Sequence, residues 1–245
     1  MTGFDVAGKT ALVTGAARRL GMHCALALAD RGANVVVHYG ASAMDAEALC
    51  ADIHRRGVKA WPVQADLQDT GQSEALFEKA VSLAGPIQVL INNASIFEPG
   101  GLSEVSAEDV NRNAAINAWA PFVLSRAFAW QGVEGRIVNL LDARVAGYDF
   151  NHVGYILSKH MLAVLTRMTA LQFAPLVTVN AIAPGLILPP PGQDEAYLQG
   201  LAEAVPLKRH GGAEDIVRAM LFLIDSPFIT GQTVFVDGGA HLKGA

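Results

Sequence analysis

Seven short runs rich in β-branched residues recur along the chain, and longer amphipathic stretches separate them. This alternation is typical of a parallel sheet, because parallel strands need crossover connections that are usually helical. Runs such as Val35-Val36-Val37 and Ile137-Val138 show no polar alternation, as expected for strands buried on both faces. We therefore predict a doubly wound three-layer α/β/α sandwich around a seven-stranded parallel sheet. The predicted strands are Thr10–Thr14, Asn34–Tyr39, Lys59–Val63, Val89–Asn92, Arg136–Leu141, Thr178–Ala183 and Thr233–Asp237.

Helical periodicity is clearest in three of the intervening stretches, Leu20–Arg31, Ala43–Arg56 and Ser73–Ala84. The chain has 245 residues, 51% of them hydrophobic, which supplies enough apolar area for one large core. No linker, repeat or low-complexity tract divides it, and Pro189-Pro190-Pro191 is typical of the rim of a loop. We predict a single domain over residues 1–245.

The charge balance argues against several classes of partner. The formal net charge is −5, and no basic patch indicates binding to nucleic acid or to an anionic membrane. Residues 1–6 lack the features of a secretion signal, and no uncharged apolar run is long enough to span a bilayer. Cys24 and Cys50 are too few for a disulfide framework, and the apolar helical context of Cys24 predicts a buried, inert thiol. We expect a cytoplasmic protein that binds a small molecule and no metal.

Ligands of such a fold bind outside the carboxyl ends of the strands, so the residues after each strand are the most informative. After the first strand, the turn from Thr14 to Gly21 opens a helix whose backbone N–H groups can face a pyrophosphate. Gly15 allows a tight bend, and Gly21 permits close packing of the helix on the strand. Taken alone, the two glycines fit an ordinary turn between strand and helix equally well.

The segment after the second strand favours NADP over NAD. It has no acidic residue that would hold a ribose 2′-hydroxyl. Arg18, His38 and Ser42 can instead donate hydrogen bonds to a 2′-phosphate, and the charge-assisted contact from Arg is the stronger kind. After the third strand, Asp66 either accepts from the adenine amino group or caps the next helix.

Polar side chains also follow the fourth strand. Asn92 and Asn93 are costly at a buried strand end unless they are hydrogen-bonded, so we expect them to tie neighbouring strands together and to border the cofactor. Further along, Asn117 is a lone polar residue in an apolar helical stretch, where a satisfied core amide is the simplest interpretation.

The segment from Asp142 to Lys159 carries the strongest functional signal. Tyr155 and Lys159 lie about one helical turn apart, so the ammonium can stabilise a phenolate and lower the pKa of the phenol. Such a tyrosine is a usable general acid or base. A Tyr and a Lys at this spacing also occur by chance on exposed helices, so the pair has weight only together with the other motifs.

Taken together, these motifs resemble the short-chain dehydrogenase/reductase family, and the resemblance covers essentially the whole chain. It implies an NAD(P)(H)-dependent oxidoreductase with a Rossmann-like core, usually a homotetramer. It also implies that Tyr155 is the proton donor and that Lys159 binds the nicotinamide ribose and tunes Tyr155. Asn117, by the same resemblance, holds a water that leads to Lys159.

Some positions depart from the usual pattern of the family. Asp142 stands where the family has a serine, Arg19 replaces the middle glycine of Thr-Gly-x-x-x-Gly-x-Gly, and Ser95 replaces the last glycine of Asn-Asn-Ala-Gly. With His38-Tyr39 and Phe97, these departures resemble the pteridine reductase branch, which has dihydropteridine and dihydromonapterin reductases as relatives. This resemblance implies NADPH-dependent reduction of a dihydropterin or dihydrofolate.

A pterin is a flat ring that needs an aromatic partner on one face, the nicotinamide on the other, and polar groups around its rim. Phe97 can supply the stack, and Ser95 and Arg19 the rim contacts, with Arg19 bridging phosphate and substrate. Alternatively, Phe97 packs the loop and Arg19 is a solvated charge. Residues 185–205, with Leu186 at their start, are expected to form a mobile flap that determines substrate choice.

Asp142 fits a reductive role. A carboxylate that accepts from the Tyr155 hydroxyl opposes phenolate formation, so it keeps the phenol protonated against the effect of Lys159. We predict that Asp142 and Tyr155 form a proton relay. The alternative is an ion pair of Asp142 with Arg144 or Lys159.

The predicted catalytic residues are Asp142, Tyr155, Lys159 and Asn117. The predicted cofactor-binding residues are Gly15, Arg18, Arg19, Leu20, Gly21, His38, Tyr39, Ser42, Asp66, Leu67, Asn93, Ala94, Ser95, Tyr155, Lys159, Pro184 and Gly185. The predicted substrate-binding residues are Arg19, Ser95, Phe97, Asp142, Tyr155 and Leu186. Two other functions stay open, namely reduction of a ketone with Asp142 in place of the serine, and a sensor that binds NADP without catalysis.

Overall fold

The computed structural model describes residues 4–190 and 192–243. Its centre is a parallel sheet of seven strands in the order β3-β2-β1-β4-β5-β6-β7. The strands are β1 (Thr10–Val13), β2 (Asn34–Tyr39), β3 (Ala60–Gln64), β4 (Val89–Asn92), β5 (Gly135–Leu140), β6 (Val177–Pro184) and β7 (Thr233–Val236). The predicted sheet is confirmed, and each strand end lies within one residue of its predicted position. The strand order reverses between β1 and β4, where ligands of this fold bind.

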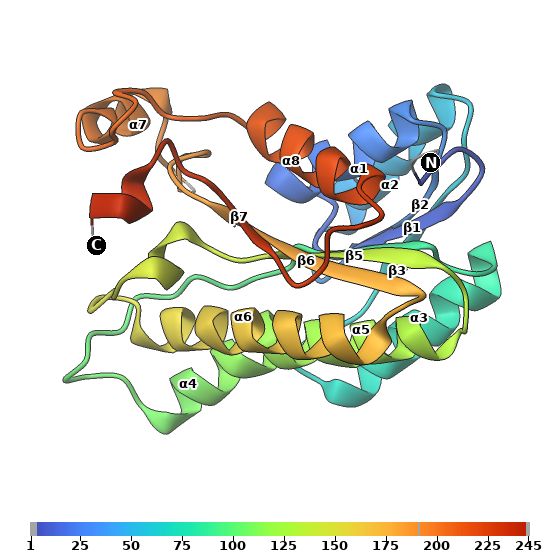
Figure 1. The fold of residues 1–245 in the computed structure, drawn as a ribbon, viewed down its shortest axis with the longest axis horizontal. Helices are drawn as coiled ribbons and strands as arrows, with labels where there is room; N and C mark the ends of the chain where they lie inside the picture. Colours follow the sequence, from blue (N-terminus) through green and yellow to red (C-terminus); the bar gives the residue numbers. More distant parts are fainter. Residues whose placement is uncertain (1–3, 191, 244–245) are drawn as a thin grey trace.

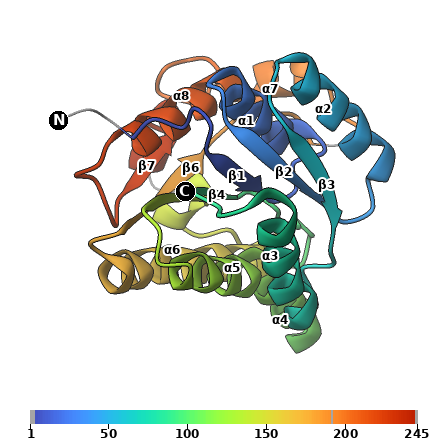
Figure 2. The same ribbon diagram turned by 90° about the vertical axis from the view of Figure 1, so that its right-hand side faces the viewer.

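Helices cover both faces of the sheet, which confirms the predicted sandwich (Figures 1 and 2). One face carries α1 (Arg19–Asp30), α2 (Ala43–Arg55) and α8 (Ala213–Asp225). The other carries α3 (Thr70–Ala84), α4 (Ala107–Ala114), the π-helical turn η1 (Ala115–Trp119), α5 (Ala120–Trp130) and α6 (Val153–Phe173). The helix predicted from Ser73 begins at Thr70, because the Asp69 side chain caps it by accepting from the Gln72 N–H.

Each face of the sheet has its own hydrophobic core. Val13 and Val37 belong to the cluster beneath α1, α2 and α8, whereas their neighbours Leu12 and Val36 belong to the cluster beneath α3 and α5. Successive residues of one strand therefore point into opposite cores, which explains the absence of polar alternation. Cys24 is fully buried in α1, so the predicted burial is confirmed, and burial raises the pKa of its thiol to about 12.

The segment predicted as a flap contains a helix, α7 (Glu195–Ala202), for which the Asp194 side chain is the N-terminal cap. Pro189 and Pro190 lie outside helices and strands, as expected for the rim of a loop, and Pro191 lies outside the described residues. In Figure 1, α7 projects beyond the end of the sheet. Within the described part of the chain, no helix is long and apolar enough to cross a membrane.

Candidate active site

Two glycines shape the turn after β1. Gly15 has a φ of +60°, a left-handed backbone conformation that favours glycine. A Cβ atom on Gly21 would lie 2.3 Å from the Gly15 carbonyl oxygen and 2.6 Å from Asn93 Nδ2, so a larger residue would push α1 away from the turn. The tight bend and the close approach expected from the sequence are therefore both present. They place the N-terminus of α1 at the carboxyl end of β1.

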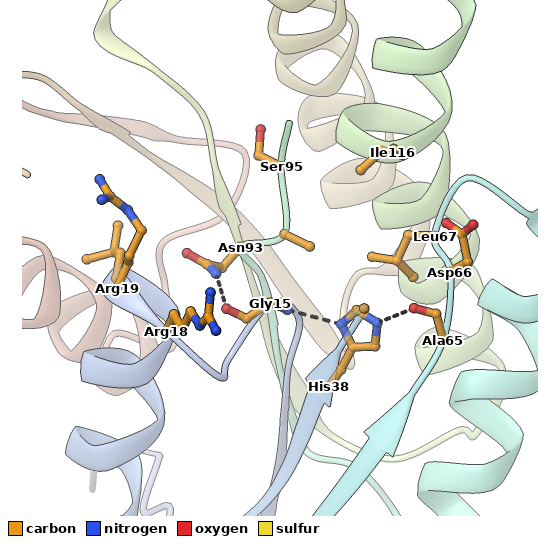
Figure 3. A pocket seen from close by; sticks show the side chains of 14 residues that line it. Gly15, Arg18, Arg19, His38, Ala65, Asp66, Leu67, Asn93, Ser95 and Ile116 are labelled. Atoms are coloured by element: carbon orange, nitrogen blue, oxygen red, sulfur yellow. Dashed lines mark hydrogen bonds between the residues drawn. The ribbon is translucent and has the colours of Figure 1, made fainter. Parts of the chain in front are cut away.

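A cavity of about 440 Å³ opens beside this turn (Figure 3). The predicted cofactor residues that line it are Gly15, Arg18, Arg19, Leu20, Gly21, His38, Asp66, Leu67, Asn93, Ala94 and Ser95. Sequence analysis missed Gly40, Ala65 and Ile116, which also line it, because a glycine or an apolar wall carries no chemical signal. The predicted residues that do not line this cavity are Tyr39, Ser42, Tyr155, Lys159, Pro184 and Gly185.

His38 holds the turn in place and does not offer a donor to a ligand. Its buried ring accepts from the Gly15 N–H at Nδ1, at 3.0 Å, and its Nε2 donates to the Ala65 carbonyl oxygen at 3.2 Å (Figure 3). Burial lowers the pKa of His38 to about 4, so the ring is neutral at pH 7. The predicted donation from His38 to a 2′-phosphate is wrong, because no ring N–H remains for it.

Of the other donors predicted for a 2′-phosphate, Arg18 lies at the cavity and Ser42 does not. The Arg18 side chain is 65% exposed, and its Nε donates to the Asp45 carboxylate at 2.6 Å. Ser42 precedes α2 at the N-cap position, but its hydroxyl makes no capping hydrogen bond. Arg18 is therefore the donor best placed for an anionic group.

Asp66 and Leu67 lie at the opposite end of the cavity from Arg19 (Figure 3). Asp66 Oδ1 accepts from the Gln68 N–H at 2.9 Å and so closes a local turn. The role of Asp66 as a helix cap, which was the alternative to an adenine contact, is wrong because Asp69 caps α3. The adenine contact stays a prediction for its carboxylate.

Asn92 and Asn93 tie β4 to both of its neighbours. Asn92 Nδ2 donates to Asn139 Oδ1 on β5 at 2.8 Å. Asn93 Nδ2 donates to the carbonyl oxygens of Thr14 and Gly15, at 2.9 and 3.1 Å, in the turn after β1. The predicted ties between strands are confirmed, and Asn93 also borders the cavity.

The side chain of Asn117 is fully buried in η1 and has protein partners at both ends. Its Oδ1 accepts from the Ser95 hydroxyl at 3.0 Å and from the Ile96 N–H at 2.8 Å. Its Nδ2 donates to the Ile96 carbonyl oxygen and to the Ser158 hydroxyl, each at 3.0 Å. The amide is therefore satisfied within the core, as the simplest interpretation expected, and the water held by Asn117 stays a prediction.

Tyr155 and Asp142 are joined by the hydrogen bond expected for a relay. The Tyr155 hydroxyl donates to Asp142 Oδ2 at 2.8 Å, and Asp142 Oδ1 accepts from the Arg144 N–H at 2.8 Å. Burial, and after it the charge and hydrogen bond of Asp142, raise the pKa of Tyr155 well above its usual value of 10. The phenol is therefore held in its protonated, donating form.

Lys159 does not have the effect on Tyr155 that the spacing predicted. Its Nζ lies 5.5 Å from the centroid of the Tyr155 ring and donates to the Leu140 carbonyl oxygen at 2.8 Å. Burial lowers the pKa of Lys159 to about 8, so its ammonium is still mostly charged at pH 7, but its hydrogen bond goes to the backbone and not to the Tyr155 hydroxyl. The prediction that the pKa of Tyr155 is lowered is wrong, because burial and Asp142 together raise it.

Phe97 belongs to a cluster that sequence analysis missed. The His152 ring stacks on Phe97 with centroids 4.0 Å apart, and the Tyr155 ring meets Phe97 edge-on at 4.7 Å. Asp149 accepts from the Arg144 guanidinium at 2.9 Å and from His152 Nδ1 at 3.0 Å. An Asp-x-x-His sequence at the start of α6 was the signal that could have pointed to this pair.

Asp142 also lines a second cavity, of about 400 Å³, between the 3-10 turns η2 (Ala143–Ala146) and η3 (Ala240–Lys243). Gly185 and Leu186 line the same cavity, so the start of the segment after β6 reaches Asp142 and not the turn after β1. The alternative ion pair of Asp142 is wrong for the described side chains, because the Arg144 guanidinium pairs with Asp149 and Lys159 bonds a carbonyl oxygen.

Comparison with known proteins agrees with this geometry. The model of a family described as Enoyl-(Acyl carrier protein) reductase matches residues 15–241. The 3-oxoacyl-[acyl-carrier-protein] reductase FabG of Staphylococcus aureus (strain Mu50 / ATCC 700699) is 33% identical over 243 residues, covering 96% of this chain and 98% of the relative. Pteridine reductase 1 of Leishmania tarentolae is 34% identical over 280 residues, covering 96% of this chain and 97% of the relative.

A solved structure gives the same result in three dimensions. FolM alternative dihydrofolate reductase 1 from Brucella canis, complexed with NADP, is similar with a TM-score of 0.92 at 34% identity, covering 97% of this chain and 96% of that one. The similarity extends from the turn after β1 to the last strand, and with it this chain belongs to the short-chain dehydrogenase/reductase family.

Proposed function

We propose that this oxidoreductase uses NADPH to reduce a pterin-type substrate, such as a dihydropteridine, dihydromonapterin or dihydrofolate. The proposal is carried by the 2.8 Å hydrogen bond from the Tyr155 hydroxyl to Asp142, at the position where the wider family has a serine. A serine there offers a hydroxyl to a substrate carbonyl, whereas a carboxylate keeps the phenol protonated. This arrangement suits reduction of a C=N bond, in which a ring nitrogen takes up a proton.

The cavity beside the turn after β1 fits NADP(H). The left-handed Gly15 and the close approach at Gly21 leave the start of α1 open to a pyrophosphate. Residues 40–42, directly after β2, include no carboxylate, and Arg18 lines the cavity with an exposed guanidinium that also pairs with Asp45 of α2. The related Brucella canis structure is a complex with NADP. The cofactor supplies the hydride that the substrate carbon accepts.

Tyr155 gives the proton that accompanies the hydride. Its hydroxyl proton passes to the substrate nitrogen, and the tyrosine regains a proton from water through Asp142, which lines the cavity between η2 and η3. Lys159, with a pKa lowered to about 8 by burial, is mostly charged at pH 7 and balances the negative charge as it develops on the phenol oxygen.

Substrate recognition falls to Phe97, Ser95 and Arg19. Phe97 is 46% exposed, and a pterin stacked on its ring would share it with His152, which stacks at 4.0 Å, and with the Arg144 guanidinium, which lies 5.1 Å from the ring centroid. The Ser95 hydroxyl and the Arg19 guanidinium already have protein acceptors, so their contacts with the substrate rim use their remaining lone pairs and N–H groups.

A second candidate is reduction of a ketone, which the similarity to FabG favours. The same Tyr155 hydroxyl could protonate an oxygen that has received a hydride. The two candidates differ in the role of Asp142. In pterin reduction Asp142 relays the proton to Tyr155, whereas in ketone reduction it stands where a serine hydroxyl would bind the substrate carbonyl.

The function is tested by NADPH oxidation with dihydrobiopterin, dihydromonapterin and dihydrofolate, against simple ketones and a 3-oxoacyl thioester. We expect turnover of at least one dihydropterin or dihydrofolate and much slower turnover of the carbonyl compounds. Faster turnover of the ketones or the thioester would replace the proposal by the second candidate. Binding of NADPH with no turnover of any substrate would indicate a sensor.

We also propose that the chain forms a homotetramer, as the family resemblance implies. The outward side of α5 and α6 carries large apolar side chains that water reaches in one isolated chain, among them Trp130, Met168 and Leu171. Such a patch is more typical of a subunit interface than of a free surface.

A further inference from the structure

Arg19, the first residue of α1, has a backbone conformation that is unusual for arginine. Its φ is +54°, in the left-handed region that glycine adopts at little cost. The usual pattern of the family has a glycine at this place, which adopts this conformation at less cost than an arginine. The arginine side chain makes a contact that a glycine would lack.

The side chain of Arg19 contacts a segment that is distant in the sequence. Arg19 Nη2 donates to the Pro189 carbonyl oxygen at 2.7 Å, and the two residues are 170 positions apart in the chain. Pro189 belongs to the segment between β6 and α7, whose described residues are 185–190 and 192–194, here named the β6–α7 segment. This hydrogen bond joins the turn after β1 to the segment that carries Leu186 into the cavity of Asp142.

The same arginine also lines the cavity that fits the cofactor. A guanidinium has five N–H groups in a planar fork, and the bond to Pro189 uses one of them. The remaining N–H groups can bind a cofactor phosphate without giving up the carbonyl, because a fork donates in several directions at once. Arg19 therefore lines the cofactor cavity and is also hydrogen-bonded to the β6–α7 segment.

We propose that Arg19 is a positioning residue that couples NADP(H) binding to the placement of the β6–α7 segment. A cofactor phosphate holds the guanidinium, the guanidinium holds the Pro189 carbonyl, and the segment is fixed over the substrate site before the substrate arrives. The proposal rests on NADP(H) as the cofactor, but not on which substrate is reduced.

The test is hydrogen exchange of residues 185–200 in the full chain, with and without saturating NADP⁺. Wild type is compared with Arg19→Gly, because glycine adopts a φ of +54° easily and the variant is expected to fold. We expect NADP⁺ to slow exchange of the segment in wild type by about fivefold or more, the value of one hydrogen bond, and to have little effect in Arg19→Gly.

Arg55→Ala is the matched control, since it removes an exposed arginine of α2 that pairs with Asp52 and lines neither cavity. At saturating NADP⁺ it should show the same slowing as wild type. In steady state, Arg19→Gly should raise the KM for the substrate more than it lowers kcat.

Equal slowing in Arg19→Gly and wild type would overturn the coupling, as would no slowing in wild type. Complete loss of NADP⁺ binding in Arg19→Gly would also overturn it, because Arg19 would then be an essential anchor of the cofactor. Exchange is measured with NADP⁺ alone, so a failure to reduce pterins would count against the proposed function and leave this result standing.

Discussion

The Tyr155 hydroxyl donates to Asp142 Oδ2 at 2.8 Å. Replacing Asp142 by asparagine keeps the shape of the side chain but removes its charge and its ability to carry a proton. We expect Asp142→Asn to lower kcat with a dihydropterin by about a hundredfold or more, the usual effect of losing one proton-transfer group. The dissociation constant of NADPH should stay within a few fold of wild type. Stopped-flow oxidation of NADPH measures the first quantity and fluorescence titration the second.

Asp52→Asn is the control for Asp142→Asn, because Asp52 is a carboxylate on α2 that pairs with Arg55. It should leave turnover unchanged. Full turnover of the dihydropterin by Asp142→Asn would show that Asp142 does not relay the proton, and the ketone candidate would then gain weight.

His38 gives a pH dependence of stability whose sign follows from its pKa, which burial lowers from the ordinary value of 6.5 to about 4. Between these two pH values the unfolded chain binds a proton that the folded chain does not. The stabilisation is therefore complete above pH 6.5 and is lost as the pH falls toward 4, by at most about 3 kcal/mol. Urea unfolding between about pH 7 and pH 4.5 should give a steeper loss for wild type than for His38→Asn, and identical slopes would refute the assignment.

For single residues, the sequence predicted contacts between side chains more accurately than it predicted the effects of those contacts. Asp142 and Tyr155 form the expected hydrogen bond. Asp142 lies just after the end of β5 and Tyr155 in the first turn of α6, and both positions could be predicted from the sequence. The effects of His38 and Lys159 were predicted wrongly, because spacing fixes neighbours but not the direction of a side chain or its burial. Both nitrogens of His38 and the Nζ of Lys159 bond to backbone groups that only the folded sheet brings near.

Among the elements, the turn from β1 into α1 is the least tolerant of added atoms. Gly21→Ala would place a Cβ 2.3 Å from the Gly15 carbonyl oxygen, so the helix start has to shift. We expect a loss of unfolding free energy of about 1–3 kcal/mol, as for other overpacked sites, and an NADPH dissociation constant raised at least tenfold. Chemical denaturation and fluorescence titration measure the two effects.

Gly200→Ala is the matched control within a helix, because Gly200 lies in α7 and a Cβ there would meet no atom within 4 Å. This change should stabilise the chain slightly, by about 0.5–1 kcal/mol, and leave NADPH binding as it was. A Gly21→Ala protein that binds NADPH as tightly as wild type would mean that the cofactor does not depend on this turn.

Strands were easier to predict than the irregular elements. A buried parallel strand has a continuous β-branched run that few other structures share, so all the strand ends lie within one residue of expectation. α7 was not expected within the flap, although Asp194 caps it, because the prolines before it suggested a loop. The π-helical turn around Asn117 has no pattern of its own in the sequence, since its backbone bonds depend on how α4 and α5 pack on α6.

For the molecule as a whole, the fold explains the site but leaves one surface without a partner. α6 has exposed apolar residues Leu157, Val164, Met168 and Leu171, whose spacing places them on one side of the helix. α5, packed beside it, adds Trp130, which is 75% exposed. A charge introduced on this side would be solvated in a free chain but buried in an assembly, where an unpaired charge is costly.

We therefore expect Leu171→Glu to reduce the mass of the assembly, from a tetramer to a smaller species, in light scattering coupled to gel filtration. Leu171 is 83% exposed in the single chain, so the change should not unfold it, and circular dichroism should match wild type. Met44→Glu is the control, since Met44 is 84% exposed on α2, across the sheet from α6. If Leu171→Glu keeps the wild-type mass, the interface lies elsewhere; if wild type is itself a monomer, the proposed tetramer is wrong and the apolar side of α5 and α6 must serve another partner.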